Sequence, residues 1–184
     1  MRVVVQRVRN AQVDVFATGY RAAIGHGLLL LAAFTDDDTE KDLEWTARKI
    51  AAMRIFDDEN GVMNLSVTDV DGEIMVVSQF TLYASTVKGN RPSYIKAAKP
   101  DVAVPLYEKF VSLMVEHSGK DVKCGVFGAD MKVSLLNDGP VTIIVDSKLK
   151  FKIKILIYGL LEEIWICPFY GGYRKVTGDT CGES

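Results

Sequence analysis

The sequence has few of the residues on which common catalytic sites depend. Its 184 residues include two histidines and three cysteines, and Cys124, Cys167 and Cys181 are far apart, without a C-x-x-C pair. A disulfide scaffold or a zinc site is therefore not expected, and we predict a protein without metal or cofactor in a reducing, cytoplasmic compartment. His26 lies between glycines and His117 near the predicted end of a helix, so neither is expected to act as a catalytic base.

Motifs for nucleotide binding and for membrane insertion are also missing. The sequence contains no G-x-x-x-x-G-K-[ST] and no G-x-G-x-x-G, so it predicts no phosphate cradle of these kinds. No apolar run approaches the length of a transmembrane helix, and residues 1–9 read as a first β-strand rather than as a signal peptide. The net charge of −2 excludes a polycation that coats nucleic acid. Any RNA would be held by a local basic patch or by a pocket around one end.

Short apolar runs of strand length dominate the first 148 residues. We predict strands at 3–8, 12–16, 28–34, 73–80, 131–136 and 141–146. The first two are expected to pair across a turn at 9–11, and the last two to be joined at Asn137–Pro140. The run at 74–77 is apolar on both faces, which is typical of a central strand.

Two helices are predicted between these strands. Residues 39–55 have apolar residues at helical spacing, and the acidic triplet at 36–38 suits a helix start better than a metal site. A second helix is expected to have Pro105 in its first turn and to end near Ser118, with a buried stripe of Leu106, Phe110, Leu113 and Met114. Because strands outnumber helices without regular alternation, the sequence predicts an α+β fold, a β-barrel-like sheet domain with two main helices.

The end of the chain differs from the rest. Residues 148–155 alternate lysine with apolar residues, the pattern of an amphipathic strand. Its lysines either protect an exposed sheet edge or contact RNA. We therefore divide the chain into a domain at 1–148 and a C-terminal extension of unknown role at 149–184.

Three segments are candidates for a functional site, each with a structural alternative. At Ser78–Leu82 a buried apolar strand turns polar, which indicates either a catalytic loop or an ordinary strand end. Lys88–Tyr94 is a basic loop that either holds phosphates or is simply solvated. Asn137–Thr142 is either a hairpin turn or a segment in which Gly139 and Pro140 present two adjacent carbonyls.

The combination of these segments resembles the D-aminoacyl-tRNA deacylase (D-tyrosyl-tRNA deacylase) family closely over residues 1–147. The matching stretches occur in the family's order, and the pair Ser-Gln-Phe-Thr and Asn-x-Gly-Pro-x-Thr is highly specific. They are Gln6–Val8, Ile24–Leu29, Arg54–Phe56, Met63–Ser66, Ser78–Leu82, Lys88–Ser93, Phe127–Met131 and Asn137–Thr142. From about Leu149 the chain departs from the family pattern.

The resemblance implies a homodimer with its active site at the subunit interface. Gly139 and Pro140, joined by a cis bond in the family, would enter the pocket of the partner and face its Ser78–Thr81 segment. Their carbonyls would crowd the side chain of an L-amino acid, whereas the D-enantiomer would fit. The expected partner is the 3′-terminal adenosine of an aminoacyl-tRNA, rather than DNA or a membrane.

The resemblance also implies roles for single residues. Gln79, Phe80 and Thr81 would form the catalytic segment, with the N–H groups of Phe80 and Thr81 as oxyanion donors. Thr81 as a covalent nucleophile is the alternative, although its hydroxyl has no visible base. The remaining substrate-binding residues would be Ser78, Phe127, Met131, Lys88 and Arg91, with Phe127 and Met131 as walls of the adenosine pocket.

The expected activity is hydrolysis of the ester of D-aminoacyl-tRNA, and of glycyl-tRNA, with a water that a ribose hydroxyl of the RNA orients. A different class of function remains open, that of a module that binds charged tRNA without hydrolysing it.

Overall fold

The computed structural model describes residues 1–150, 156–157 and 160–161. The chain divides into two compact units, Met1–Lys148 and Leu149–Ser184. In the second, the short strands β9 (Leu156–Ile157) and β10 (Leu160–Leu161) pair antiparallel with each other. The predicted strand at 148–155 is wrong at its start, because Ser147–Lys150 form the 3-10 helix η2, and 151–155 lie outside the described residues.

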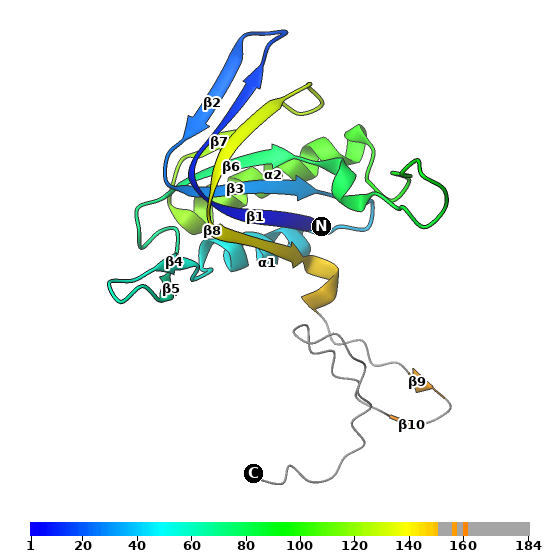
Figure 1. Ribbon diagram of the computed structural model, residues 1–184. Helices are drawn as coiled ribbons and strands as arrows, with labels where there is room; N and C mark the ends of the chain where they lie inside the picture. The colour runs from blue at the N-terminus through cyan, green and yellow to red at the C-terminus, as the bar shows by residue number, and fades with distance from the viewer. Residues whose placement is uncertain (151–155, 158–159, 162–184) are drawn as a thin grey trace. The chain divides into compact units, whose positions relative to one another are not determined.

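The first unit is built on a mixed six-stranded sheet (Figure 1). The strands follow the order β2-β1-β3-β6-β7, and β8 pairs with β1 as well. Their bounds are β1 Arg2–Val15, β2 Tyr20–Ile24, β3 Gly27–Ala33, β6 Glu73–Ser78, β7 Val122–Cys124 and β8 Lys132–Asp146. β3, β6 and β7 run parallel, whereas β1 is antiparallel to β2, β3 and β8. A separate hairpin pairs β4 (Phe56–Asp57) with β5 (Met63–Leu65).

Strand β1 differs from the prediction of two strands around a turn. Residues 9–11 lie within one long strand, and the turn comes later, between Val15 and Tyr20. The first half of β1 pairs with β3 and the second half with β2, while shifts of register between Gln6 and Asn10 mark an irregular stretch against β8. Such bulges bend a strand without ending it, so the polar residues at 9–10 mark a bend.

Strand β8 corrects the expectation of a hairpin at Asn137–Pro140. Both of its halves pair with β1, at Lys132–Asn137 and at Thr142–Asp146, so they do not fold back on each other. The Gly139–Pro140 peptide bond is cis. The turn-forming residues therefore lie in the middle of a long strand, opposite the irregular stretch of β1.

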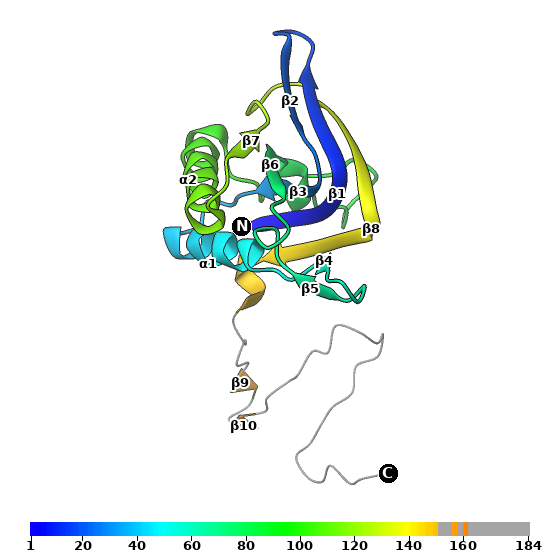
Figure 2. The same ribbon diagram turned by 90° about the vertical axis from the view of Figure 1, so that its left-hand side faces the viewer.

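Two helices cover one face of the sheet (Figure 2). The first, α1 (Glu40–Ala51), begins at Thr39, whose hydroxyl and main-chain N–H both bond the Asp42 carboxylate. It ends earlier than predicted, because the chain leaves the helix at Ala52 to enter β4.

The second helix, α2 (Pro100–Ser118), starts before the predicted position. Pro100 occupies the first turn, where its missing N–H costs nothing, and Pro105 lies inside the helix. Gly119 ends it in the left-handed conformation, and the last helical residue is Ser118, where the sequence predicts the end. Leu106 is only half-buried; the buried face consists of Ala103, Tyr107, Phe110, Leu113, Met114 and Ser118.

The main apolar core lies between these helices and the sheet, with Phe110, Ile50, Leu30 and Val76 among its fully buried members. A smaller cluster occupies the other face and includes Leu29, Met75 and Val77. The sheet curls around this second face, so that the Tyr20 hydroxyl on β2 donates to the Cys124 carbonyl on β7 at 2.8 Å. The expected barrel-like α+β fold with two main helices is therefore confirmed.

No helix among the described residues has the length and apolar character needed to cross a membrane.

Candidate active site

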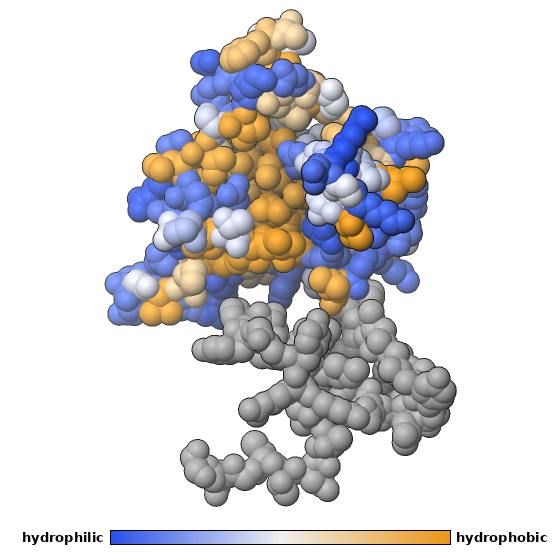
Figure 3. All heavy atoms as spheres, turned by 45° about the vertical axis from the view of Figure 1, so that its right-hand side comes forward, coloured by the Kyte–Doolittle hydropathy of each residue, from blue (hydrophilic) through white to orange (hydrophobic). Residues whose placement is uncertain are grey.

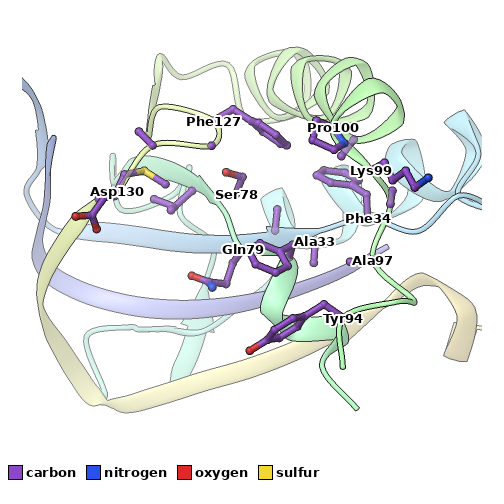
Figure 4. A pocket seen from close by; sticks show the side chains of 18 of the residues that line it. Ala33, Phe34, Ser78, Gln79, Tyr94, Ala97, Lys99, Pro100, Phe127 and Asp130 are labelled. Carbon is purple, nitrogen blue, oxygen red and sulfur yellow. The ribbon is translucent and has the colours of Figure 1, made fainter. Parts of the chain in front are cut away.

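A cavity of about 580 Å³ opens where β3 and β6 end. The two strands are parallel, with Ala32 opposite Ser78, so their carboxyl ends meet at one edge of the sheet. In open sheets with parallel strands, such edges are favoured positions for ligands. The walls come from four segments of the chain (Figure 4). They are Ala32–Phe34, Val77–Phe80, Tyr94 with Ala97–Pro100 and Ala103, and Phe127–Met131 with Val133.

The Ser-Gln-Phe-Thr segment lies at this edge, where β6 ends. The Gln79 N–H donates to the Ala32 carbonyl at 2.7 Å, which ties the end of β6 to β3. The 3-10 helix η1 (Phe80–Tyr83) follows at once. The first N–H groups of a helix have no intrahelical acceptor, and here they belong to Phe80 and Thr81.

Within this segment, the side chains of Gln79 and Thr81 contact each other. The Gln79 amide donates a short hydrogen bond to the Thr81 hydroxyl. Because the Gln79 amide is the donor in this bond, it does not act as a base that accepts the proton of the Thr81 hydroxyl. Ser78, Gln79 and Phe80 line the cavity, whereas Thr81 is not part of its wall.

Phe127 and Met131 are both part of the wall, from the loop before β8. The Phe127 ring meets Tyr107 edge to face, with centroids 5.8 Å apart. The Tyr107 hydroxyl donates to the Val76 carbonyl at 2.9 Å, and burial raises the pKa of this hydroxyl, so it stays protonated. Helix α2 thereby holds Phe127 in position, and Figure 4 shows Phe127 and Tyr94 at opposite ends of the cavity.

Gly125 makes room for Met131. A Cβ at Gly125 would lie 2.6 Å from the Met131 sulfur, closer than any real contact. The Gly125 N–H also donates to the Val76 carbonyl at 2.9 Å, so the backbone there is close to β6. A side chain at this position would force the Met131 sulfur to move.

The basic loop lies next to the cavity and not in its wall. Lys88 and Arg91 are exposed, and the loop that carries them is closed by mutual main-chain hydrogen bonds of 2.8 and 2.9 Å between Ser85 and Ser93. From there the chain runs back past Tyr94, which does line the cavity.

Gly139 and Pro140 do not line the cavity of their own chain. Their backbone is held by residues of β1 and β8. The Asn137 amide donates to the carbonyls of Arg7 and Val141, at 3.1 Å each. Gly139 has φ +120°, a conformation that other residues rarely adopt, and an added Cβ would lie 2.8 Å from the Val141 side chain.

Neither histidine lines the cavity. His26 packs edge to face on Phe56, with ring centroids 5.0 Å apart, and His117 Nε2 lies 2.8 Å from a Glu44 carboxylate oxygen. Among residues 1–150 and the four further residues described, no group of three or more His, Cys, Asp or Glu side chains is placed to hold a metal ion.

Sequence reasoning did not single out Arg7, Tyr107 or Gly125. Arg7 had a signal, because it is a charged residue within a predicted apolar strand, and the residue is in fact only 6% exposed. Tyr107 and Gly125 matter because of contacts with residues that are not their neighbours in the sequence. The sequence pattern around them therefore does not indicate their roles.

On the face that Figure 3 shows, apolar side chains gather in a hollow between hydrophilic rims. Strand β8 itself carries several exposed apolar residues. They are Val133, Leu135, Leu136 and Ile144, of which Ile144 is 66% exposed.

Comparison with known proteins places these features in a family. The family model described as D-Tyr-tRNA(Tyr) deacylase matches residues 4–146. A protein of Flavobacterium johnsoniae named D-aminoacyl-tRNA deacylase is 62% identical over 149 residues, which are 80% of this chain and 98% of that protein. One of the same name from Parabacteroides distasonis is 59% identical over 150 residues, 82% of this chain and 99% of that protein.

Two solved structures share the fold. The structure of a protein named c-Myc DNA Unwinding Element Binding Protein has a TM-score of 0.73 at 41% identity, covering 79% of this chain and 98% of that one. A probable eukaryotic D-amino acid tRNA deacylase has a TM-score of 0.68 at 20% identity, covering 78% and 97%. At that identity, the second likeness concerns the fold alone.

Proposed function

The chain belongs to the D-Tyr-tRNA(Tyr) deacylase family, and we propose that it hydrolyses the ester bond between a D-amino acid and the terminal adenosine of a tRNA. The observation that carries the proposal is the cavity at the carboxyl ends of β3 and β6, which is bounded by Ser78–Phe80, Phe127 and Met131. The substrate is a component of translation, so the proposed compartment is the cytoplasm.

The cavity suits a nucleoside. Its volume of about 580 Å³ lies within the usual range for small-molecule sites. Phe127 offers an aromatic wall whose orientation Tyr107 fixes, and Met131 an adaptable apolar one. We assign these two side chains to the adenosine and Ser78 to the edge where the ester lies.

The N–H groups of Phe80 and Thr81 are the proposed donors to the oxyanion. Water attacks the ester carbonyl carbon and loses a proton, while negative charge forms on the carbonyl oxygen. The bond to the ribose oxygen then breaks and this oxygen takes up a proton, which releases free tRNA and the amino acid. Removal of one such donor costs roughly 3 kcal/mol of transition-state stabilisation in other acyl-transfer sites. A ribose hydroxyl of the terminal adenosine orients the water, so the RNA supplies part of the catalytic machinery.

A covalent mechanism through Thr81 is the less favoured route. Its hydroxyl receives a hydrogen bond from Gln79, and neither histidine lines the cavity. A hydroxyl without a base to accept its proton is a weak nucleophile. We therefore assign a positioning role to Gln79, which holds Thr81 and the first turn of η1 in place.

We also propose a homodimer in which Gly139 and Pro140 of one chain enter the cavity of the other. Two features support this arrangement: the two residues do not line their own cavity, and the same strand exposes Leu135, Leu136 and Ile144. Exposed apolar groups on one strand are typical of an interaction surface. The carbonyls of Gly139 and Pro140 would occupy the space that an L side chain needs, so chirality is selected by exclusion.

A deacylation assay with D- and L-tyrosyl-tRNA tests the proposal. We expect release of D-tyrosine and protection of the L-ester. Tight binding of both charged tRNAs without turnover would instead identify a module that binds charged tRNA. Sedimentation of the protein tests the dimer separately.

A further inference from the structure

The cavity is bordered by a chain segment with charge of one sign. From Ile74 to Pro100 the sequence has four basic residues and no acidic one, although the whole chain has a net charge of −2. We name the part from Ala84 to Lys99 the basic segment; its cations are Lys88, Arg91, Lys96 and Lys99. A concentration of positive charge in an otherwise acidic protein indicates a local binding surface for anions.

These four cations are not neutralised by the part of the protein that the structure describes. All four side chains are exposed, and none forms an ion pair with another of the described residues. Some exposed cations elsewhere do have partners: Lys132 pairs with Asp130, and Arg21 with Asp14. The basic segment thus presents charges that an external anion can use.

The segment starts and ends at the cavity. At its end, Lys99 and Tyr94 line the wall, and just before its start Phe80 does so. The Phe80 and Tyr94 rings meet edge to face with centroids 5.1 Å apart, and the Ser85–Ser93 hydrogen bonds close the loop beyond them. Lys88 and Arg91 lie on that loop, which is drawn in green and projects from the body of the domain on the right of Figure 1.

Aromatic rings add a second element of recognition. Phe80 is 56% and Tyr94 40% exposed, side by side at the cavity. Exposed aromatic side chains next to available cations are the combination with which proteins bind single-stranded nucleic acid, because bases stack on the rings while phosphates contact the cations.

We propose that the basic segment binds the phosphodiester backbone of the unpaired RNA strand that leads to the terminal adenosine. This inference rests on the proposed function. Lys99 contacts the phosphate nearest the cavity, Tyr94 stacks with the preceding base, and Lys88 and Arg91 bind phosphates further along the strand. A single-stranded RNA end is the occupant that matches a cavity sized for one nucleoside and bordered by the basic segment.

The test compares two substrates that differ in whether the RNA strand is present. One is D-tyrosyl-tRNA and the other is adenosine esterified with D-tyrosine at its 3′ oxygen. For the double variant Lys88→Ala/Arg91→Ala, we expect kcat/KM on the tRNA to fall roughly tenfold relative to kcat/KM on the adenosine ester. The salt dependence on tRNA should also weaken, by about 0.7 in log–log slope for each phosphate that the variant no longer binds.

A matched control removes one lysine and one arginine elsewhere. Lys41 and Arg48 are exposed on α1, which contributes nothing to the cavity wall. The variant Lys41→Ala/Arg48→Ala should therefore preserve the ratio of kcat/KM on the tRNA to kcat/KM on the adenosine ester, and also the slope of the salt dependence. An unchanged ratio and slope in Lys88→Ala/Arg91→Ala would overturn the proposal. Tighter binding of a DNA duplex than of a CCA-ended RNA strand would also overturn it. If the wild type hydrolyses neither D-ester, the proposed function itself fails, which separates the two outcomes.

Discussion

The buried guanidinium of Arg7 donates a hydrogen bond through Nε to the main-chain carbonyl of Asp138, at 3.2 Å. Its Nη1 donates to the Ile55 carbonyl at 2.7 Å and reaches the Asp57 carboxylate at 3.2 Å. Arg7 therefore links β1, the end of the α1–β4 connection and the peptide that immediately precedes Gly139. In the proposed mechanism it acts as a positioning residue for the two carbonyls that select chirality.

Replacing Arg7 by lysine should damage selectivity more than folding. A lysine ammonium cannot form the same fixed set of directed bonds as a guanidinium. We expect a loss of about 2 kcal/mol of stability, a Tm lower by roughly 4–8 °C, and a smaller ratio of D- to L-tyrosyl-tRNA hydrolysis. Arg9→Lys is the matched control, because Arg9 contacts the same Asp138 at 3.0 Å but is exposed. A folded Arg7→Lys variant with the wild-type ratio would show that Arg7 has a structural role only.

The sequence predicts the site segments better than the path of the strands. Ser78–Thr81 and Phe127–Met131 are short, local motifs, and the structure brings both to one cavity. The two predicted turns, at 9–11 and at Asn137–Pro140, are both wrong, because bulged pairing between β1 and β8 carries each strand through residues that usually end one. The early start of α2 is also not evident from the sequence. Pro100 and Pro105 both suit the first turn of a helix, and only packing against the sheet decides at which of them the helix starts.

Substitutions at Gly139 and at Pro140 should have different effects, since the first strains the backbone and the second does not. An alanine at Gly139 would have φ +120° and a Cβ 3.1 Å from Arg7 Nη2, so it should cost on the order of 1–3 kcal/mol in strain. Pro140→Ala adds no atoms but releases the fixed φ of the ring. For Pro140→Ala we expect a folded protein with a reduced D/L hydrolysis ratio, measured beside circular dichroism. An unchanged ratio would remove Pro140 from chiral selection.

A chain that ends at Lys148 should retain structure and activity. Every cavity residue lies before that point, and the first compact unit ends there. Ser147 links the end of this unit to its first residue. Its N–H donates to the Met1 carbonyl at 2.9 Å, and its hydroxyl accepts from the Met1 ammonium at 2.7 Å. Lys148 adds a hydrogen bond to the Asp37 carbonyl at 2.8 Å.

A chain ending at Asp146 is the comparison, since it lacks these contacts. It should have a lower Tm than the chain ending at Lys148, and thermal unfolding with single-turnover deacylation measures both effects. Loss of activity in the chain ending at Lys148 would mean that residues 149–184 contribute to the site or to the dimer.

Stability should fall in acid through particular carboxylates. The main-chain N–H groups of Val62 and Asn60 donate to Asp58 and lower its pKa from the usual value. A carboxyl whose folded pKa is depressed contributes stability that is present above the unfolded pKa, about 4, and is lost as the pH falls through the folded pKa. Asp58→Asn should therefore lower Tm at neutral pH, and the difference should shrink below about pH 4. Asp36→Asn, an exposed change on another loop, is the control; a difference for Asp58→Asn that is constant with pH would contradict this account.

In the proposed mechanism, the site excludes an L side chain at Cβ while it hydrolyses the same ester of a D-amino acid. The direct measurement uses one tRNA charged in turn with D-alanine, glycine and L-alanine, at equal enzyme concentration. Glycine has no Cβ to exclude, and a methyl group adds only about 1 kcal/mol of favourable contact. We predict that glycyl-tRNA is hydrolysed within one or two orders of magnitude of D-alanyl-tRNA, while L-alanyl-tRNA is spared. If glycyl-tRNA is protected as fully as L-alanyl-tRNA, exclusion at Cβ is the wrong mechanism, and the enzyme must instead bind the D side chain.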